Sequence, residues 1–284
     1  MNPERVGVIG GGLMGSGIAE VFARAGSQVV VHEIDANAAE AAQARIEASL
    51  ARAVERGKLE ASSRDQALAG IMVSTDLADQ ADRRLVIEAA NENEALKRQI
   101  FADLDAVVVD RDAILASNTS SIPITRLASV TSRPDHVVGL HFFNPVPIMA
   151  LVEMVTTVMT APEVAARARD YAEGLEKTVI ESRDRAGFIV NMLLVPYLLG
   201  AIKMLEAGFA TREDIDTGMR LGANHPMGPL ELSDFVGLDT MKLIADVLFD
   251  EFKDPMYASP PLLTRLVEAG LLGRKTGRGF YEYG

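Results

Sequence analysis

The residue best suited to proton transfer is His141, which follows the apolar run 137–140. A proline-containing loop, 142–147, comes directly after it, and an imidazole titrates near neutral pH, so this position suits a general acid or base. Glu153 lies in the next apolar run, where a carboxylate is costly unless it has a partner. We expect Glu153 to pair with His141, orient its ring and favour its protonated form.

These residues also have plain structural interpretations. A single histidine after a strand is more often a loop or core residue, and an acid in a short strand can face water at an edge. The polar segment 117–121 follows another apolar run, and its serines could cap a helix that begins near Ile124. The chemical interpretation is favoured because these clusters accompany a predicted nucleotide site.

A glycine-rich segment near the start of the chain predicts that nucleotide site. Gly10, Gly12 and Gly15 have the GxGxxG spacing between an apolar run and a helical run. Gly10 allows a tight turn, Gly12 the close approach of a pyrophosphate, and Gly15 the close packing of helix on strand. The amino end of the helix, including Leu13 and Met14, offers unpaired N–H groups to the phosphates.

The next strand-like run ends on an acid, Glu33, 18 residues after Gly15. A carboxylate here would accept hydrogen bonds from the adenosine ribose and repel a 2′-phosphate. No arginine occurs in the nine residues that follow. The segment therefore predicts NAD rather than NADP as the cofactor, and the alternative is a Rossmann-type glycine turn that binds nothing.

Apolar runs that alternate with helical segments predict an α/β fold with a Rossmann-type, mostly parallel sheet. Residues 38–55 predict one long helix stopped by Gly57, and a shorter helix is expected near 62–68, so the pair would form a helical-hairpin insertion. The expected strands lie near 6–9, 29–33, 71–74, 85–89, 113–117, 136–141, 151–155 and 178–181.

Strand-like runs cease near residue 184, and helical patterns follow. We expect an NAD-binding Rossmann domain over 1–184 and a smaller all-α substrate-binding domain over 185–284. The apolar run 188–205 contains a proline and a lysine, which favours a buried helix over a membrane span. Together with the apolar segment 241–249 it exceeds what one small helical layer can bury, which predicts a homodimer through this domain.

Composition excludes several classes of function. A net charge of −12 disfavours nucleic acid as a partner, because a phosphate backbone needs a basic surface. The chain has no cysteine and only four histidines, so neither a disulfide framework nor a bound metal is expected. The first strand is expected within six residues of Met1, which leaves no room for a signal peptide and predicts a cytoplasmic protein with no membrane partner.

Several specific motifs occur along the chain: the glycine loop, SNTSSIPIT at 117–125, GLHFFNPVPIMALVE at 139–153, DRAGFIVN at 184–191, NHPMGPLELSDFVGLDT at 224–240 and GRKTGRGFYEY at 273–283. They resemble those of the short-chain L-3-hydroxyacyl-CoA dehydrogenase family, in particular its bacterial 3-hydroxybutyryl-CoA branch, over essentially the whole chain. The resemblance implies hydride transfer between NAD and C3 of an acyl-CoA thioester, with a preference for short acyl chains.

The resemblance also implies roles for residues at matching positions. His141 would take the hydroxyl proton during oxidation and return it during reduction, with Glu153 supporting it. Ser120 and Asn191 would hydrogen-bond the substrate oxygens. The implied cofactor contacts are Glu92, Lys97, Ser120, Asn144 and Lys275, and the implied CoA contacts are Ser49, Arg52, Arg56 and Lys58, which would supply local positive charge.

The chain departs from the family pattern at Ala186, where a proline is usual, and at Met192, where an arginine is common. Two other functions stay open. A dehydrogenase of a free small hydroxy acid, of the gulonate type, shares this architecture, although the basic segment 49–58 favours CoA. A non-catalytic binding protein on the same fold is disfavoured by the four intact residues Ser120, His141, Glu153 and Asn191.

Overall fold

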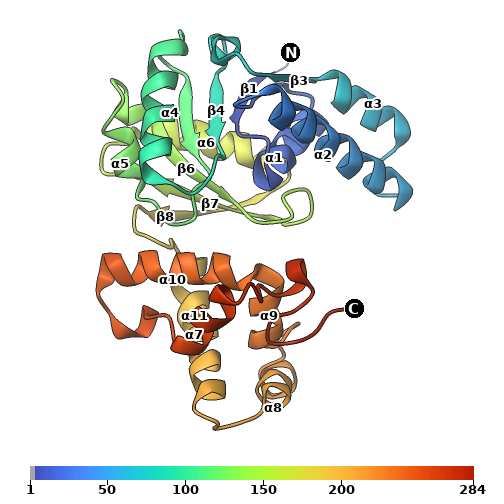
Figure 1. Cartoon of the computed structure of the whole chain (residues 1–284). Helices are drawn as coiled ribbons and strands as arrows, with labels where there is room; N and C mark the ends of the chain where they lie inside the picture. Colours follow the sequence, from blue (N-terminus) through green and yellow to red (C-terminus); the bar gives the residue numbers. More distant parts are fainter. Residues whose placement is uncertain (1–3) are drawn as a thin grey trace. The chain divides into compact units, whose positions relative to one another are not determined.

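A single eight-stranded sheet organises residues 5–183 in the computed structural model, which describes residues 4–284 (Figure 1). Its order is β3-β2-β1-β4-β5-β6-β7-β8, and every neighbouring pair is parallel except β6 with β7. The predicted mostly parallel sheet is therefore confirmed. The strands are β1 (Arg5–Ile9), β2 (Gln28–His32), β3 (Ile71–Ser74), β4 (Leu85–Glu88), β5 (Ile114–Ser117), β6 (Val137–Phe142), β7 (Leu151–Thr156) and β8 (Thr178–Arg183).

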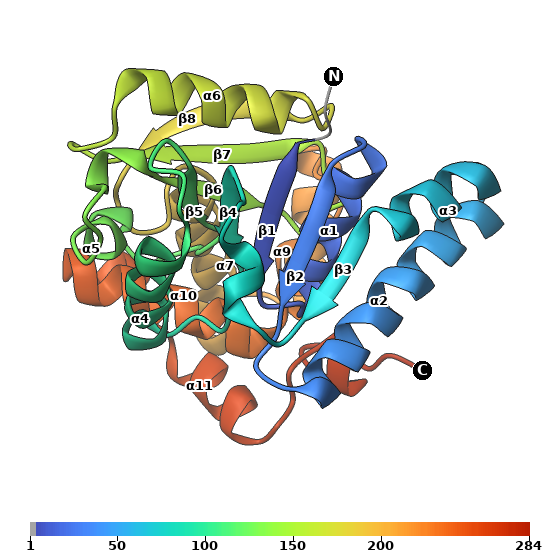
Figure 2. The same cartoon turned by 90° about the horizontal axis from the view of Figure 1, so that it is seen from above.

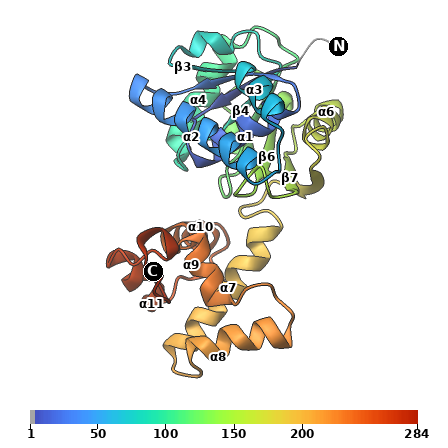
Figure 3. The same cartoon turned by 90° about the vertical axis from the view of Figure 1, so that its right-hand side faces the viewer.

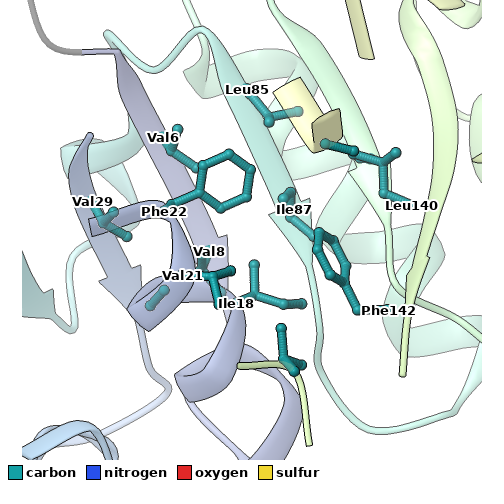
Figure 4. Close-up of a cluster of buried hydrophobic side chains, with 14 of the residues drawn as sticks. Val6, Val8, Ile18, Val21, Phe22, Val29, Leu85, Ile87, Leu140 and Phe142 are labelled. Atoms are coloured by element: carbon teal, nitrogen blue, oxygen red, sulfur yellow. The ribbon is translucent and has the colours of Figure 1, made fainter. Parts of the chain in front are cut away.

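Helices connect these strands and bury the sheet. The α-helices are α1 (Leu13–Arg24), α2 (Ala36–Glu55), α3 (Ala61–Ala69), α4 (Glu94–Val107), α5 (Ile124–Ala128) and α6 (Pro162–Glu173), and short 3-10 turns occur at Leu77–Gln80 and Pro134–His136. The apolar strands need this cover, and Figure 4 shows Ile18 and Phe22 of α1 packed against β-strand side chains such as Val8 and Ile87. Strand order reverses between β1 and β4, which is where doubly wound sheets bind ligands.

The predicted helical hairpin is present as α2 and α3, which lie side by side beyond β3 (Figure 2) and pack on α1. Gly57 ends α2 with a left-handed φ of 63°. Two backbone bonds accompany it, from Gly57 N to Val54 O at 2.9 Å and from Lys58 N to Ala53 O at 2.8 Å. This Schellman pattern fixes the direction in which the chain leaves α2.

The chain divides into two units, Met1–Arg185 and Ala186–Gly284, and the second is built from helices. Its core forms where α7 packs against α9, α10 and α11 (Figure 3). Asp234 joins two of the sequence motifs, because its carboxylate accepts hydrogen bonds from the backbone of Phe280 and Tyr281 at 2.9 Å. The helical segments are α7 (Val190–Glu206), α8 (Arg212–Thr217), a π-helical turn (Gly218–Gly222), α9 (Pro229–Val236), α10 (Leu238–Phe252) and α11 (Pro261–Glu268), with 3-10 turns at Pro255–Tyr257 and Arg274–Thr276.

Across residues 4–284, no helix combines the length and the apolar character that a membrane crossing requires.

Candidate active site

His141 and Glu153 face each other across the antiparallel pair β6 and β7. Directly opposed residues of such a pair lie on the same face of the sheet, so the register brings the two side chains together. His141 Nδ1 donates to Glu153 Oε2 at 2.7 Å, Glu153 is fully buried, and His141 is 7% exposed. The carboxylate thus engages Nδ1 and fixes the orientation of the imidazole ring.

Asn118 holds the end of β6 in place. Its Oδ1 accepts a hydrogen bond from Phe142 N at 2.9 Å, and its own N–H donates to Glu88 O at 2.8 Å. The ends of β4, β5 and β6 are therefore tied together beside His141. Sequence reasoning did not single out Asn118, although its place directly after a strand was a usable signal.

The polar segment 117–121 gathers around Glu92. Glu92 Oε1 accepts hydrogen bonds from Thr119 Oγ1 at 2.6 Å, from Ser121 Oγ at 2.9 Å and from the backbone N–H of Ser120 at 3.0 Å. Burial alone would raise the pKa of Glu92, but Lys97 and these hydrogen bonds outweigh burial and lower it. Glu92 is therefore held ionised, with the Ser120 hydroxyl 3.3 Å from it.

The helix-capping interpretation of these serines is wrong. The first N–H groups of α5, on Ile124 and Thr125, donate to the carboxylate of Asp184, each at 2.7 Å. Asp184 lies about sixty residues further along the chain, so no local pattern around the serines could indicate it.

Lys97 is enclosed by protein, with an exposure of 1%. Its Nζ donates to Glu88 Oε1 at 2.6 Å and to Ala90 O at 3.0 Å, and it lies 3.4 Å from Glu92 Oε2. Glu88 is fully buried at the end of β4 and also accepts from Ser117 Oγ at 2.6 Å. The buried ion pair of Lys97 and Glu88 therefore has the additional hydrogen bonds that such a pair needs. Lys97 also brings this pair next to Glu92. Sequence reasoning missed Glu88, although an acid ending an apolar strand was the same signal that drew attention to Glu33.

The glycine loop has the geometry that its spacing predicts. Gly10 has a φ of 92°, which favours glycine, and its N–H donates to His32 O at 2.9 Å. A Cβ on Gly15 would lie 1.7 Å from Gly10 O, so close packing of helix on loop requires glycine there. A Cβ on Gly12, the N-cap of α1, would have no protein atom within 4 Å. This open N-terminus, followed by exposed Leu13 and half-buried Met14, fits the phosphates of a dinucleotide.

Glu33 lies one residue beyond β2 and turns toward the glycine loop. Its Oε1 accepts a hydrogen bond from Gly11 N at 2.6 Å, while Arg45 of α2 donates to Gly11 O at 2.9 Å. The half-buried carboxylate is therefore next to the loop, where the adenosine ribose of a dinucleotide would lie. Arg45 was not predicted, because it lies 34 residues from its partner.

The four residues expected to contact CoA line one cavity of ≈ 570 Å³ in the first unit. Ser49 and Arg52 come from α2, and Arg56 and Lys58 from the turn at Gly57. Another part of the wall comes from the loop after β6, which Lys177 Nζ anchors through hydrogen bonds to Val146 O at 2.7 Å and Met149 O at 2.8 Å. The loop residues on that wall are Pro145, Pro147 and Ile148.

The remaining predicted residues are placed as follows. Asn144 is exposed in the loop after β6. In the second unit, Asn191 is buried in the first turn of α7, and Lys275 pairs with Asp239 at 2.6 Å. Within residues 4–284, no group of three or more histidine and acidic side chains is arranged to hold a metal ion.

Comparison with known proteins assigns both units to one family. Residues 5–185 match the family model described as 3-hydroxyacyl-CoA dehydrogenase, NAD binding domain, and residues 187–283 match the one described as 3-hydroxyacyl-CoA dehydrogenase, C-terminal domain. The chain belongs to the 3-hydroxyacyl-CoA dehydrogenase family. The resemblance inferred from the sequence motifs is confirmed, and so is NAD as the cofactor of this dehydrogenase.

Individual relatives are similar over nearly their full length. A 3-hydroxybutyryl-CoA dehydrogenase from Mycobacterium tuberculosis is 59% identical over 99% of this chain and 98% of its own. The human mitochondrial hydroxyacyl-coenzyme A dehydrogenase is 44% identical over 99% of this chain and 91% of its own. The crystal structure of (S)-3-hydroxybutyryl-CoA dehydrogenase from Ralstonia eutropha superposes with a TM-score of 0.94 at 44% identity, covering 100% of both chains.

The place of Glu33 in this dehydrogenase gives a prediction about cofactor choice. The wild type should prefer NADH over NADPH, and Glu33→Gln should raise kcat/KM for NADPH by at least about tenfold, because a like charge facing the 2′-phosphate is removed. Glutamine keeps an acceptor for Gly11 N. Steady-state kinetics with both cofactors measure the effect, and Glu40→Gln, on the exposed side of α2, is the matched control. A wild-type preference for NADPH would contradict the assignment.

Proposed function

We propose that this protein interconverts a short-chain 3-hydroxyacyl-CoA, such as 3-hydroxybutyryl-CoA, and the corresponding 3-oxoacyl-CoA. The observation that carries the proposal is the His141–Glu153 hydrogen bond near the carboxyl end of β6, in the same unit as an NAD-type glycine loop. The names of the relatives from Mycobacterium tuberculosis and Ralstonia eutropha support the same substrate class.

In this proposal, the glycine loop and Glu33 would hold NAD, which when bound would supply hydride-transfer chemistry at C3 of the acyl group. His141 takes the C3 hydroxyl proton at Nε2 during oxidation and returns it during reduction. Glu153 stabilises the imidazolium that forms and keeps Nδ1 as the donor. Ser120 and Asn191 are proposed to hydrogen-bond the substrate oxygens, and Glu92, Asn144 and Lys275 to contact the cofactor.

Lys97 takes a different part in the proposal. Because its ammonium is buried against Glu88 and Glu92, we assign it to holding those carboxylates. The cofactor would then contact Glu92, whose side chain is 21% exposed. Lys97 would supply positive charge from the buried side of Glu92.

The cavity beside α2 supports an acyl-CoA over a free hydroxy acid. Arg52, Arg56 and Lys58 are exposed cations along one wall of it, in a chain whose net charge is −12. A free hydroxy acid offers one carboxylate to such a wall, whereas CoA offers several phosphates. The cationic wall is therefore assigned to the nucleotide part of CoA.

A spectrophotometric assay tests this function. NADH oxidation should be followed with acetoacetyl-CoA and with free acetoacetate at equal concentration, and then over a series of acyl-chain lengths. We expect turnover with acetoacetyl-CoA and little with acetoacetate. Comparable turnover of free acetoacetate would favour the gulonate-type alternative, and inactivity toward every substrate would favour a binding protein.

Exposed apolar side chains on the second unit support a proposed homodimer. Leu193 on α7 is 72% exposed, and Phe209 and Leu221 are also largely exposed. Such side chains gain from burial against a second copy, and the two-fold dimer is the commonest soluble assembly.

Light scattering at micromolar concentration should therefore give twice the chain mass of 30.5 kDa. Leu193→Glu should give monomer or aggregate, because a charge would enter the contact. Val158→Glu, at an exposed valine of the first unit, should leave the mass unchanged. A wild-type mass near 30.5 kDa would rule out the dimer.

A further inference from the structure

Glu20 of α1 is a buried carboxylate with one oxygen left unpaired. Its side chain is 1% exposed, and Oε1 accepts a hydrogen bond from Arg24 Nη1 at 3.3 Å. Oε2 has no hydrogen-bond partner among the described residues 4–284. Buried polar atoms are nearly always satisfied, and a missing partner costs about 1–3 kcal/mol or more for a charged group. Another molecule is therefore expected to complete this site.

The position of Glu20 limits what that molecule can be. Glu20 lines the same cavity as the cations Arg52, Arg56 and Lys58, but those side chains are exposed whereas Glu20 is buried. A phosphate would bind the cations and be repelled by the carboxylate. The group that meets Glu20 is therefore not an anion, and it must carry an N–H or O–H donor.

A CoA thioester has such groups next to its phosphates, because its pantetheine arm carries two amide N–H groups and a hydroxyl. We propose that Glu20 Oε2 accepts a hydrogen bond from an amide or hydroxyl of the pantetheine arm, which makes Glu20 a specificity residue for the thioester carrier. This inference rests on the proposed function, since it assigns the cavity to CoA.

Two thioester substrates distinguish binding of the pantetheine arm from binding of the nucleotide. Acetoacetyl-pantetheine keeps the amides and hydroxyls but lacks the phosphates of acetoacetyl-CoA. Glu20→Leu should raise KM for both thioesters by about tenfold or more, since a hydrogen bond to a charged group is lost. Glu20→Gln keeps one uncharged acceptor and should raise both KM values by about threefold. KM for NADH should stay within about twofold in each variant, because the glycine loop is unchanged.

Arg24→Gln is the matched control, because it removes the internal partner of Glu20 and keeps the carboxylate. Arg24 also lines the cavity, but acetoacetyl-pantetheine offers its guanidinium no phosphate, so we expect KM for that thioester to stay unchanged. If Arg24→Gln reproduces the effect of the Glu20 variants on both thioesters, Glu20 acts only through its ion pair and the proposal fails. The proposal also fails if Glu20→Gln leaves both KM values unchanged. If Glu20→Leu does not fold, the KM values of Glu20→Gln alone test the proposal.

A double variant, Arg56→Gln with Lys58→Gln, distinguishes this result from failure of the proposed function. It should raise KM for acetoacetyl-CoA and leave KM for acetoacetyl-pantetheine unchanged. Equal KM values for wild type and double variant with acetoacetyl-CoA would show that the cavity does not hold the nucleotide of CoA. That outcome would overturn the substrate assignment and, with it, the role of Glu20.

Discussion

Replacing His141 with alanine is expected to lower turnover by about 10²- to 10⁴-fold, the usual contribution of general acid–base catalysis. The imidazole is held by Glu153 and lies at the end of β6, so its loss removes the proposed proton acceptor without disturbing the glycine loop. NADH affinity, measured by fluorescence titration, should change little.

His136→Ala is the matched control for this variant. His136 lies in the 3-10 turn just before β6, and its ring pairs with exposed Asp135. We expect the control to keep nearly full turnover. If His141→Ala, purified and folded, also turns over at a near-normal rate, His141 is not the acid–base group.

Replacing Glu153 with glutamine should give the second-largest loss. Glutamine keeps the shape of the side chain but not its charge, and a hydrogen bond to a charged group contributes about 1.5–3 kcal/mol. If that stabilisation applies to the imidazolium in the transition state, turnover should fall by about 10- to 100-fold. In the reduction direction, the pH–rate profile should also move to lower pH, because the protonated imidazole has lost its carboxylate.

Glu181→Gln provides the comparison for Glu153→Gln. Glu181 lies on the neighbouring strand β8, pairs with Arg169 and is exposed. Its loss should leave both the rate and the pH profile as in the wild type. Unchanged rate and profile in Glu153→Gln itself would show that the hydrogen bond to His141 has no part in the reaction.

The sequence was most informative where one strong physical rule applied to a short segment. The glycine spacing predicted a turn that only glycine can make, and the cost of a carboxylate in an apolar strand predicted the contact of Glu153 with His141. The direction of β7 was also open to prediction, because the connection 143–150 is too short for a parallel crossover. Only an antiparallel neighbour fits such a loop.

Contacts between distant segments could not be predicted in this way. Nothing near Ile124 indicates that Asp184 caps its helix, and nothing near Gly11 indicates Arg45. The buried pair of Lys97 and Glu88 depends on how α4 packs beside β4, which a local pattern does not contain. The burial of Glu20 could not be predicted either, because it follows from the packing of α1 and not from the neighbours of Glu20 in the chain.

The register of β6 and β7 makes the contact between His141 and Glu153 independent of the loop that joins the two strands. His141 and Glu153 meet through strand pairing, so the loop between the strands can change without moving them. That loop supplies Pro145, Pro147 and Ile148 to the cavity wall. A one-residue shift within β7, by contrast, would turn Glu153 to the other face of the sheet. Variation in the loop can therefore reshape the cavity wall while the contact between His141 and Glu153 is retained.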